Sequence, residues 1–312
     1  MRLGLHLWPH SPSKYGNHFD TLLAVVQAGE HAGLDSVWMP DHFMFPPDHP
    51  MFPDEEEVPL LECFVVLGAI AAKTSGIRMG QLVTGVPYRN PALLAKMLAT
   101  LDVISHGRTI VGLGAAWHEP EFTSYGWTFP SVPERMEMLE EAVQIVDLML
   151  PHRPASFTGN HQSIPVAYYD PRPVQKPRPP IRIGGSGERV TLQLVAHYAD
   201  LCNVFGDPAT VAHKFDVIRR HCERVGRPLD EITLGNHVGG ILVAADEADL
   251  AAKKELHPGF GGIIGTPDVV RSRLQEYADA GSEYMTFSVP GADDIEAIQL
   301  IGENVLPQLS GP

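Results

Sequence analysis

The sequence predicts an α/β protein, a (β/α)8 TIM barrel with insertion loops. Short apolar runs typical of buried strands alternate with helical patterns along the whole chain. Three helix-to-strand junctions resemble one another, since each holds a small residue, an acid and an apolar run: "HAGLDSVWM", "HYADLCNVF" and "DAGSEYMTF". Eight such strand–helix units in 312 residues fit a single barrel domain spanning residues 1–312. A doubly wound open sheet is the main alternative, because it also separates its strands by helices.

The first half of the chain supplies four expected strands and three expected helices. Helix 18–31 has apolar residues at helical spacing on one face, and Gly33 is suited to end it. Helices 91–105 and 133–150 each begin with proline, which is common in a first turn. The strands, each expected from a short apolar run, are 2–8, 36–39, 78–84 and 109–114.

The second half continues the same alternation. The expected strands are 180–184, 200–205, 231–244 and 283–289, and the expected helices are 188–197, 208–225, 267–280 and 293–306. Strands separated by helices pair in parallel, so their C-terminal ends should share one mouth of the barrel. Three connections are longer than a barrel needs, at 43–57, 115–131 and 151–179. The first two follow strand ends and are expected to rise over that mouth.

Composition excludes several classes of partner. The net charge of −15 argues against binding to nucleic acid or to an anionic membrane surface. No apolar run reaches the roughly 18 residues of a membrane span, and the N-terminus reads as a strand, so we expect no signal peptide. The three cysteines are scattered and form no C-x-x-C pair, which predicts neither disulfides nor a cysteine zinc site. We expect a reduced, cytoplasmic enzyme.

The stretch "SVWMPDHF" (36–43) ends an apolar strand with Asp41 and His42 side by side. Burying two ionisable groups without partners is costly. In a barrel, residues at the C-terminal end of a strand face the mouth, where active sites lie. His42 is therefore a candidate for proton transfer near neutral pH. The alternative is a loop histidine that hydrogen-bonds only its neighbour.

Other histidines raise the question of a metal site. His6, His118 and His237 fall in or near expected strands, where imidazoles could converge. The first strand lacks the paired histidines of barrel metallohydrolases, and "HEPEF" lacks the second histidine of a helical zinc motif. We therefore expect no metal, and interpret His6 and His237 as hydrogen-bonded barrel residues.

The segment "IRIGGSGERV" (181–190) is a strand, a glycine-rich turn and an expected helix start. Backbone N–H groups in such a turn can approach an anion, and a helix N-terminus adds a favourable dipole. A basic run in and beside this segment favours a bound phosphate, and comprises Arg172, Lys176, Arg178, Arg182 and Arg189. The turn can also be explained by tight strand–helix packing without a ligand.

A second small-residue strand end, "VGLGAAW" (111–117), provides little side-chain bulk. A flat, large ligand could lie against Ala115 and Ala116, although close helix–strand packing would select the same residues. "QLVTGVPYRNP" (81–91) ends the third expected strand with a polar and glycine cluster, and its Asn90-Pro91 reads as a turn before a helix.

Taken together, five segments resemble the bacterial luciferase-like oxidoreductase family, in the branch that uses the deazaflavin coenzyme F420. They cover most of the chain in the family's order: "SVWMPDHF", "GQLVTGVPYRNPALLAKMLATLDVISHGRTIVGLGAAWHEPEF", "PERMEMLEEAV", "PPIRIGGSGERVTLQLVAHYADLCN" and "GTPDVVRSRLQEYADAG". The family fold is a TIM barrel with insertions, as the strand pattern also predicts.

The resemblance implies a role for each matching residue. Asp41 would contact the cofactor, and His42 would be the acid or base beside its ring. A non-proline cis peptide bond would fall around Leu82 and Val83, with Thr84 beside it. The remaining implied cofactor contacts are Ala115 and Ala116 along the ring, and Gly184, Gly185, Ser186 and Gly187 at the phosphate. The basic run could receive the inner part of the cofactor's anionic tail.

The chain departs from the family's sugar-phosphate dehydrogenases at one position. Those enzymes carry a catalytic glutamate just after the fourth strand's glycines, where Trp117 stands here. The resemblance implies an F420-dependent oxidoreductase that acts on a small organic substrate, and a homodimer. Because Trp117 stands at that position, we expect the substrate not to be glucose 6-phosphate. Two alternatives stay open: a monooxygenase using reduced FMN, and a non-catalytic cofactor-binding protein on the same barrel.

Overall fold

The computed structural model describes residues 1–8, 17–47, 58–290 and 293–309. Within these residues, eight parallel strands form a closed ring in the order β1 (Arg2–His6), β2 (Ser36–Met39), β3 (Arg78–Gln81), β5 (Thr109–Gly114), β8 (Ile181–Gly184), β9 (Leu201–Phe205), β10 (Gly235–Val243) and β12 (Tyr284–Ser288). The ring closes because β10 pairs with β9 and β12, and β12 pairs with β1. The predicted (β/α)8 barrel is confirmed, and the alternative prediction of a doubly wound open sheet is wrong.

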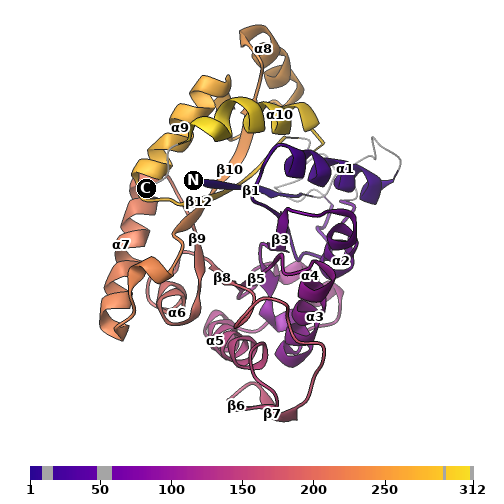
Figure 1. Cartoon of the computed structure of the whole chain (residues 1–312), viewed down its shortest axis with the longest axis vertical. Helices are drawn as coiled ribbons and strands as arrows, with labels where there is room; N and C mark the ends of the chain where they lie inside the picture. The colour runs from indigo at the N-terminus through magenta and orange to yellow at the C-terminus, as the bar shows by residue number, and fades with distance from the viewer. Residues whose placement is uncertain (9–16, 48–57, 291–292, 310–312) are drawn as a thin grey trace.

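Helices surround the strands in the view down the short axis of the molecule (Figure 1). They are α1 (His18–His31), α2 (Cys63–Lys73), α3 (Pro91–Ile104), α4 (Glu119–Ser124), α5 (Val132–Met149), α6 (Thr191–Tyr198), α7 (Pro208–Val225), α8 (Glu247–Leu256), α9 (Pro267–Asp279) and α10 (Ile295–Leu300). The expected helix at 188–197 begins three residues late, so Arg189 lies in the turn before α6 rather than in its first turn.

Several elements escaped prediction. Helix α2 has the sequence "CFVVLGAIAAK", which is apolar almost throughout and so hides any helical period. Part of the expected loop 151–179 is an antiparallel hairpin, β6 (Ala155–Thr158) and β7 (Ser163–Ala167). After β10, helix α8 leads into β11 (Gly262–Gly265), which pairs with β10 outside the ring. The expected loop 43–57 lies partly outside the described residues.

The barrel interior is filled nearest the N-terminal ends of its strands. Trp38, Ile110, Leu201 and Tyr284 pack together there and are buried. The Trp38 indole N–H donates to the Ser36 hydroxyl at 2.7 Å and to the Tyr284 hydroxyl at 2.9 Å, so its polar atom is satisfied. A separate and larger apolar cluster lies between the strands and the helices. Space for a ligand is therefore left at the C-terminal ends of the strands.

The third expected strand, 78–84, is interrupted after β3. The peptide bond between Leu82 and Val83 is cis, as the family resemblance implies. The chain then resumes as β4 (Thr84–Gly85), which pairs with β5. The interruption places two apolar side chains, Leu82 and Val83, at the mouth of the barrel between β3 and β5.

Cys63, Cys202 and Cys222 are all free and buried. None of the helices in the described ranges combines the length and the apolar character that crossing a bilayer requires.

The close approach of β3 to β5 leads to a test of the barrel. A Cβ added to Gly112 would lie 1.8 Å from the carbonyl oxygen of Gln81, which is backbone and cannot turn aside. We expect Gly112→Ala to lower the free energy of unfolding by about 1–3 kcal/mol, the usual cost of overpacking. Gly68→Ala is the matched control, because nothing lies within 4 Å of the new methyl group in α2. That change should stabilise by up to about 1 kcal/mol. Urea denaturation measures both, and equal stabilities would contradict this account of the β3–β5 contact.

Candidate active site

A cavity of about 310 Å³ opens at the C-terminal ends of the strands, where barrel enzymes place their sites. Its volume falls at the lower end of the range for small-molecule sites. It is lined by Asp41, His42, Leu82, Val83, Gly85, Tyr88, Gly114, Ala115, Ala116, Trp117, Gly184, Gly185, Thr191, Asn203 and Phe205. Most of these side chains are apolar or absent, which suits a flat ring, and the polar ones are few.

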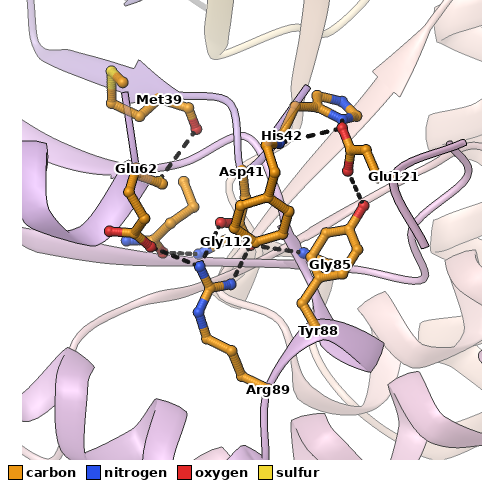
Figure 2. A network of polar contacts seen from close by, with 12 residues as sticks. Met39, Asp41, His42, Glu62, Gly85, Tyr88, Arg89, Gly112 and Glu121 are labelled. Atoms are coloured by element: carbon orange, nitrogen blue, oxygen red, sulfur yellow. Dashed lines mark hydrogen bonds and ion pairs between the residues drawn. The ribbon is translucent and has the colours of Figure 1, made fainter. Parts of the chain in front are cut away.

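His42 meets a buried acid at this cavity. Its Nδ1 lies 2.7 Å from Oε1 of Glu121, whose side chain is fully buried while that of His42 is 14% exposed. The other carboxylate oxygen of Glu121 accepts a hydrogen bond of 2.6 Å from the Tyr88 hydroxyl. The backbone N–H of Phe43 also donates to Oε1, at 3.3 Å. Figure 2 shows His42 and Tyr88 converging on Glu121 from opposite sides.

This geometry assigns the donors in the cluster. Both oxygens of Glu121 already accept hydrogen bonds, from the Phe43 N–H and the Tyr88 hydroxyl, so Nδ1 of His42 is placed as a third donor to this carboxylate. The imidazole is then held in one orientation, and its Nε2 remains to exchange a proton with a ligand. Burial, followed by the hydrogen bond to Glu121, raises the pKa of Tyr88, which stays a neutral donor.

Asp41 has a different set of partners from its neighbour. The Arg89 guanidinium binds both of its carboxylate oxygens, at 2.6 and 2.9 Å, and the Gly85 N–H donates at 3.2 Å. Arg89 also reaches Glu62 at 2.8 Å (Figure 2). Burial raises the pKa of Asp41 to about 6, and the bonds from Arg89 oppose that rise. Asp41 lines the cavity, yet its carboxylate is already occupied by protein donors.

Aromatic side chains surround the His42 imidazole. The ring centroids of Phe45, Trp117 and His118 lie 5.0, 5.4 and 5.9 Å from its own. Trp117 is 54% exposed and belongs to the cavity wall, so an indole stands there beside His42.

The predicted cofactor contacts divide into two groups. Seven line the cavity: Asp41, Leu82, Val83, Ala115, Ala116, Gly184 and Gly185. Three do not: Thr84, Ser186 and Gly187. The Ser186 hydroxyl accepts the Phe205 N–H at 3.1 Å, and the buried Thr84 hydroxyl has no hydrogen-bond partner among the described residues. Their contacts with a cofactor stay predictions.

Val83 shapes the wall between β5 and β8. A Cβ on Gly114 would lie 2.4 Å from a methyl group of Val83, and one on Gly184 would lie 2.9 Å from its other methyl group. The two glycines therefore leave room for the valine, and the three residues together give a smooth surface. A planar ring fits such a wall, which supports the predicted ligand class.

Two members of the predicted basic run, Arg178 and Arg182, do not lie beside the glycine turn, whereas Arg189 does. Arg178 precedes β8, at the opposite end of the strand from that turn, and is ion-paired with Asp147 and Asp200. Arg182 is buried inside the barrel. Alternation along β8 directs Arg182 inward, and a sequence run of cations does not reveal which way each one points.

The strand histidines do not assemble a metal site. His6 and His237 face each other with ring centroids 5.5 Å apart. Burial lowers the pKa of both, that of His237 to about 4, so both rings are neutral. The parts of the chain that are described contain no group of three histidine, cysteine or acidic residues arranged to hold a metal ion.

Sequence reasoning missed Glu121 and its partner Tyr88. "HEPEF" is weighed for zinc and belongs to a segment that resembles the family, but neither interpretation gives its second acid a role, although that acid follows an apolar strand end, as His42 does. Tyr88 sits in "GVPYRNP", in the polar and glycine cluster that ends the third expected strand, and no role is predicted for it. Neither interpretation could show that His42 and Glu121, which are 79 positions apart, are in contact.

Comparisons with known proteins identify the family and the fold. A model of the luciferase-like monooxygenase family matches residues 1–262. The F420-dependent glucose-6-phosphate dehydrogenase of Microbacterium testaceum is 27% identical, and the alignment covers 90% of each chain.

Solved structures share the fold. The coenzyme F420-dependent tetrahydromethanopterin reductase of Methanopyrus kandleri superposes with a TM-score of 0.80 at 21% identity, covering 99% of each chain. The oxygenating constituent of 3,6-diketocamphane monooxygenase from Pseudomonas putida, in complex with FMN, gives a TM-score of 0.76 at 16% identity over 100% of this chain and 99% of that one. With the family model matching most of its length, the chain belongs to the luciferase-like monooxygenase family.

Proposed function

We propose that the protein is an F420-dependent oxidoreductase that transfers a hydride between the deazaflavin and a small organic substrate. The observation that carries this proposal is His42, oriented by a buried carboxylate at the rim of a smooth-walled cavity. A relative 27% identical over 90% of the chain is named for F420 dependence, which favours this cofactor.

The roles of the protein residues follow from their contacts. The bound cofactor supplies the hydride chemistry, and the protein supplies binding, orientation and electrostatics. His42 gives or takes the accompanying proton through Nε2, while Glu121 holds Nδ1. Leu82, Val83, Ala115 and Ala116 would support the ring, and the turn from Gly184 to Gly187 would receive the phosphate.

The substrate is proposed to be less polar than a sugar phosphate. Trp117 occupies the wall beside His42, and aromatic rings form much of its surroundings. The glucose-6-phosphate dehydrogenase named above matches 90% of the chain, so glucose 6-phosphate should be included in the substrate panel. Turnover of that sugar phosphate would contradict the proposed substrate class. The homodimer and the cytoplasmic location stay predictions.

A reduced-FMN monooxygenase is the second candidate. The family model is that of luciferase-like monooxygenases, and the FMN-bound monooxygenase from Pseudomonas putida shares the fold. A flat ring and a phosphate are common to both cofactors, so the cavity wall and the glycine turn suit either. A non-catalytic binding protein is the third, since Trp117 replaces the second acid of the sugar-phosphate dehydrogenases.

A titration of the purified protein with F420 and with FMN separates these candidates. We expect F420 to bind more tightly, with hydride transfer to or from members of an alcohol, enone and imine panel. Tighter FMN binding, with oxygen consumption by the reduced flavin, would instead identify a monooxygenase. Tight binding with no turnover across the panel would identify a carrier.

His42→Ala should preserve F420 binding while lowering kcat by about 10²–10⁴, the usual contribution of general acid–base catalysis. Stopped-flow kinetics and a binding titration on the same preparation measure the two quantities separately. His197→Ala is the matched control, because this histidine is exposed on α6 and does not line the cavity. Equal turnover in the two variants would remove His42 from the mechanism.

Glu121→Gln should keep the shape of the side chain but lose the negative charge that orients His42. Turnover is expected to fall by about 10-fold or more, because a charge-assisted hydrogen bond is replaced by a weaker neutral one, while F420 affinity stays within about twofold. Tyr88→Phe removes only one donor to Glu121 and should have a smaller effect on turnover. A Glu121→Gln enzyme with unchanged kcat would show that His42 needs no such partner.

A further inference from the structure

Arg182 is a fully buried cation in the barrel interior without a matching anion. Its guanidinium lies 4.3 Å from the Trp38 ring centroid and 5.3 Å from that of Tyr284. Its Nη2 donates to the Asn203 side-chain oxygen and, at 3.4 Å, to the Thr286 hydroxyl. Nε and Nη1 have no hydrogen-bond partner, and no carboxylate pairs with the group, within the residues that the structure describes.

Arg108 shows how the same chain buries an arginine for structural purposes. Its guanidinium donates to four backbone carbonyl oxygens and to the Thr74 hydroxyl, at 2.7–3.0 Å. Every nitrogen of that group is therefore satisfied. An unpaired buried charge is costly, so Arg182 differs from Arg108 in that two of its nitrogens have no acceptor among the described residues and its charge is balanced only by aromatic faces and neutral acceptors.

Asn203 connects this cation to the cavity. A guanidinium only donates hydrogen bonds, so the side-chain oxygen of Asn203 must face Arg182. The amide NH2 group is then turned away from Arg182, and it is buried without an acceptor in the described part of the chain. Asn203 lines the cavity. The cavity wall therefore includes a residue whose buried amide donor lacks an acceptor in the described part of the chain and whose oxygen is bound to a cation.

The neighbouring titratable groups do not neutralise Arg182. His237 contacts the Thr286 hydroxyl at 3.1 Å, and its ring faces His6. Burial and then the charge of Arg182 hold the pKa of His237 at about 4, so neither it nor His6 carries charge near neutral pH. Burial also lowers the pKa of Arg182, to about 10, which leaves it protonated.

We propose that Arg182 and Asn203 form a subsite for a ring carbonyl oxygen of the bound cofactor and favour the reduced form of that ring. A ring that accepts a hydride gains one negative charge, which a flavin-type ring spreads onto its carbonyl oxygens. The Asn203 NH2 group donates to such an oxygen, and the Arg182 charge stabilises the added electron density. This inference rests on the proposed function, because it needs a redox cofactor in the cavity.

The test is the affinity for each redox state, measured anaerobically without substrate. Dissociation constants for oxidised and reduced F420, and for both forms of FMN, are compared in the wild type and in Arg182→Met. We expect the variant to lose at least about tenfold more affinity for the reduced form than for the oxidised form. For a two-electron couple, this tenfold change lowers the midpoint potential of the bound cofactor by about 30 mV.

Three further variants separate electrostatics from packing. Arg182→Lys keeps the charge and should recover most of the preference for the reduced form. Asn203→Asp supplies Arg182 with an anion and removes the amide donor. It should therefore weaken binding of the reduced cofactor as Arg182→Met does. It replaces Arg182→Met in the test if that variant does not fold. Arg178→Met, at an arginine paired with Asp147 and Asp200 outside the cavity, should leave the ratio unchanged.

The outcomes are distinct. Cofactor binding with the same ratio of affinities in wild type, Arg182→Met and Asn203→Asp would overturn the subsite while leaving the oxidoreductase proposal in place. Equal losses for both redox states would assign Arg182 to packing alone and overturn the inference as well. Failure of the wild type to bind F420 or FMN in either state would overturn the proposed function itself.

Discussion

The Arg89 guanidinium organises the mouth of the barrel by joining segments that are distant in sequence. It binds Asp41 after β2 through two hydrogen bonds and reaches Glu62, whose other carboxylate oxygen accepts the Val65 N–H in the first turn of α2. Because a guanidinium and a carboxylate match in a fixed geometry, this pair sets the position of the residue that follows Asp41. That residue is His42, so the placement of the imidazole depends on an ion pair that it does not join.

Two buried acids at the mouth thus have different chemistry. Asp41 is paired with a cation that never loses its proton, which makes it a structural anchor. Glu121 is bound by an imidazole, a phenol and one backbone amide, the first of which can exchange protons. The adjacent residues Asp41 and His42 therefore differ in role: Asp41 holds the loops together, and His42 faces the cavity.

The fold could be predicted because its signals are local. Apolar runs of strand length and helices with prolines at their starts recur in order, and the ring of parallel strands follows from that recurrence. Helix α2 was missed because an almost wholly apolar segment has no visible period. His42 could be proposed because it ends a strand. Glu121 could not, because its burial depends on packing between α4 and the residues after β2 and β4.

Two arginines, Arg178 and Arg182, also show what sequence proximity cannot predict. Arg178 and Arg182 lie four positions apart in one basic run, which suggested a single anion site. In the barrel, Arg178 sits at the strand's N-terminal end among aspartates, and Arg182 points into the interior beneath the cavity. A sequence shows that charges are near one another along the chain, but the direction of each side chain depends on the register of a closed sheet.

The packing of Val83 against Gly114 and Gly184 has a consequence for how this site can change over evolutionary time. Among the protein atoms, the valine methyl groups are what an added Cβ at either glycine would clash with. Alanine at either glycine becomes sterically acceptable once residue 83 is smaller, and a larger residue at 83 demands that both glycines stay. The three positions are thus coupled, so homologues that differ here should have exchanged them together rather than one at a time.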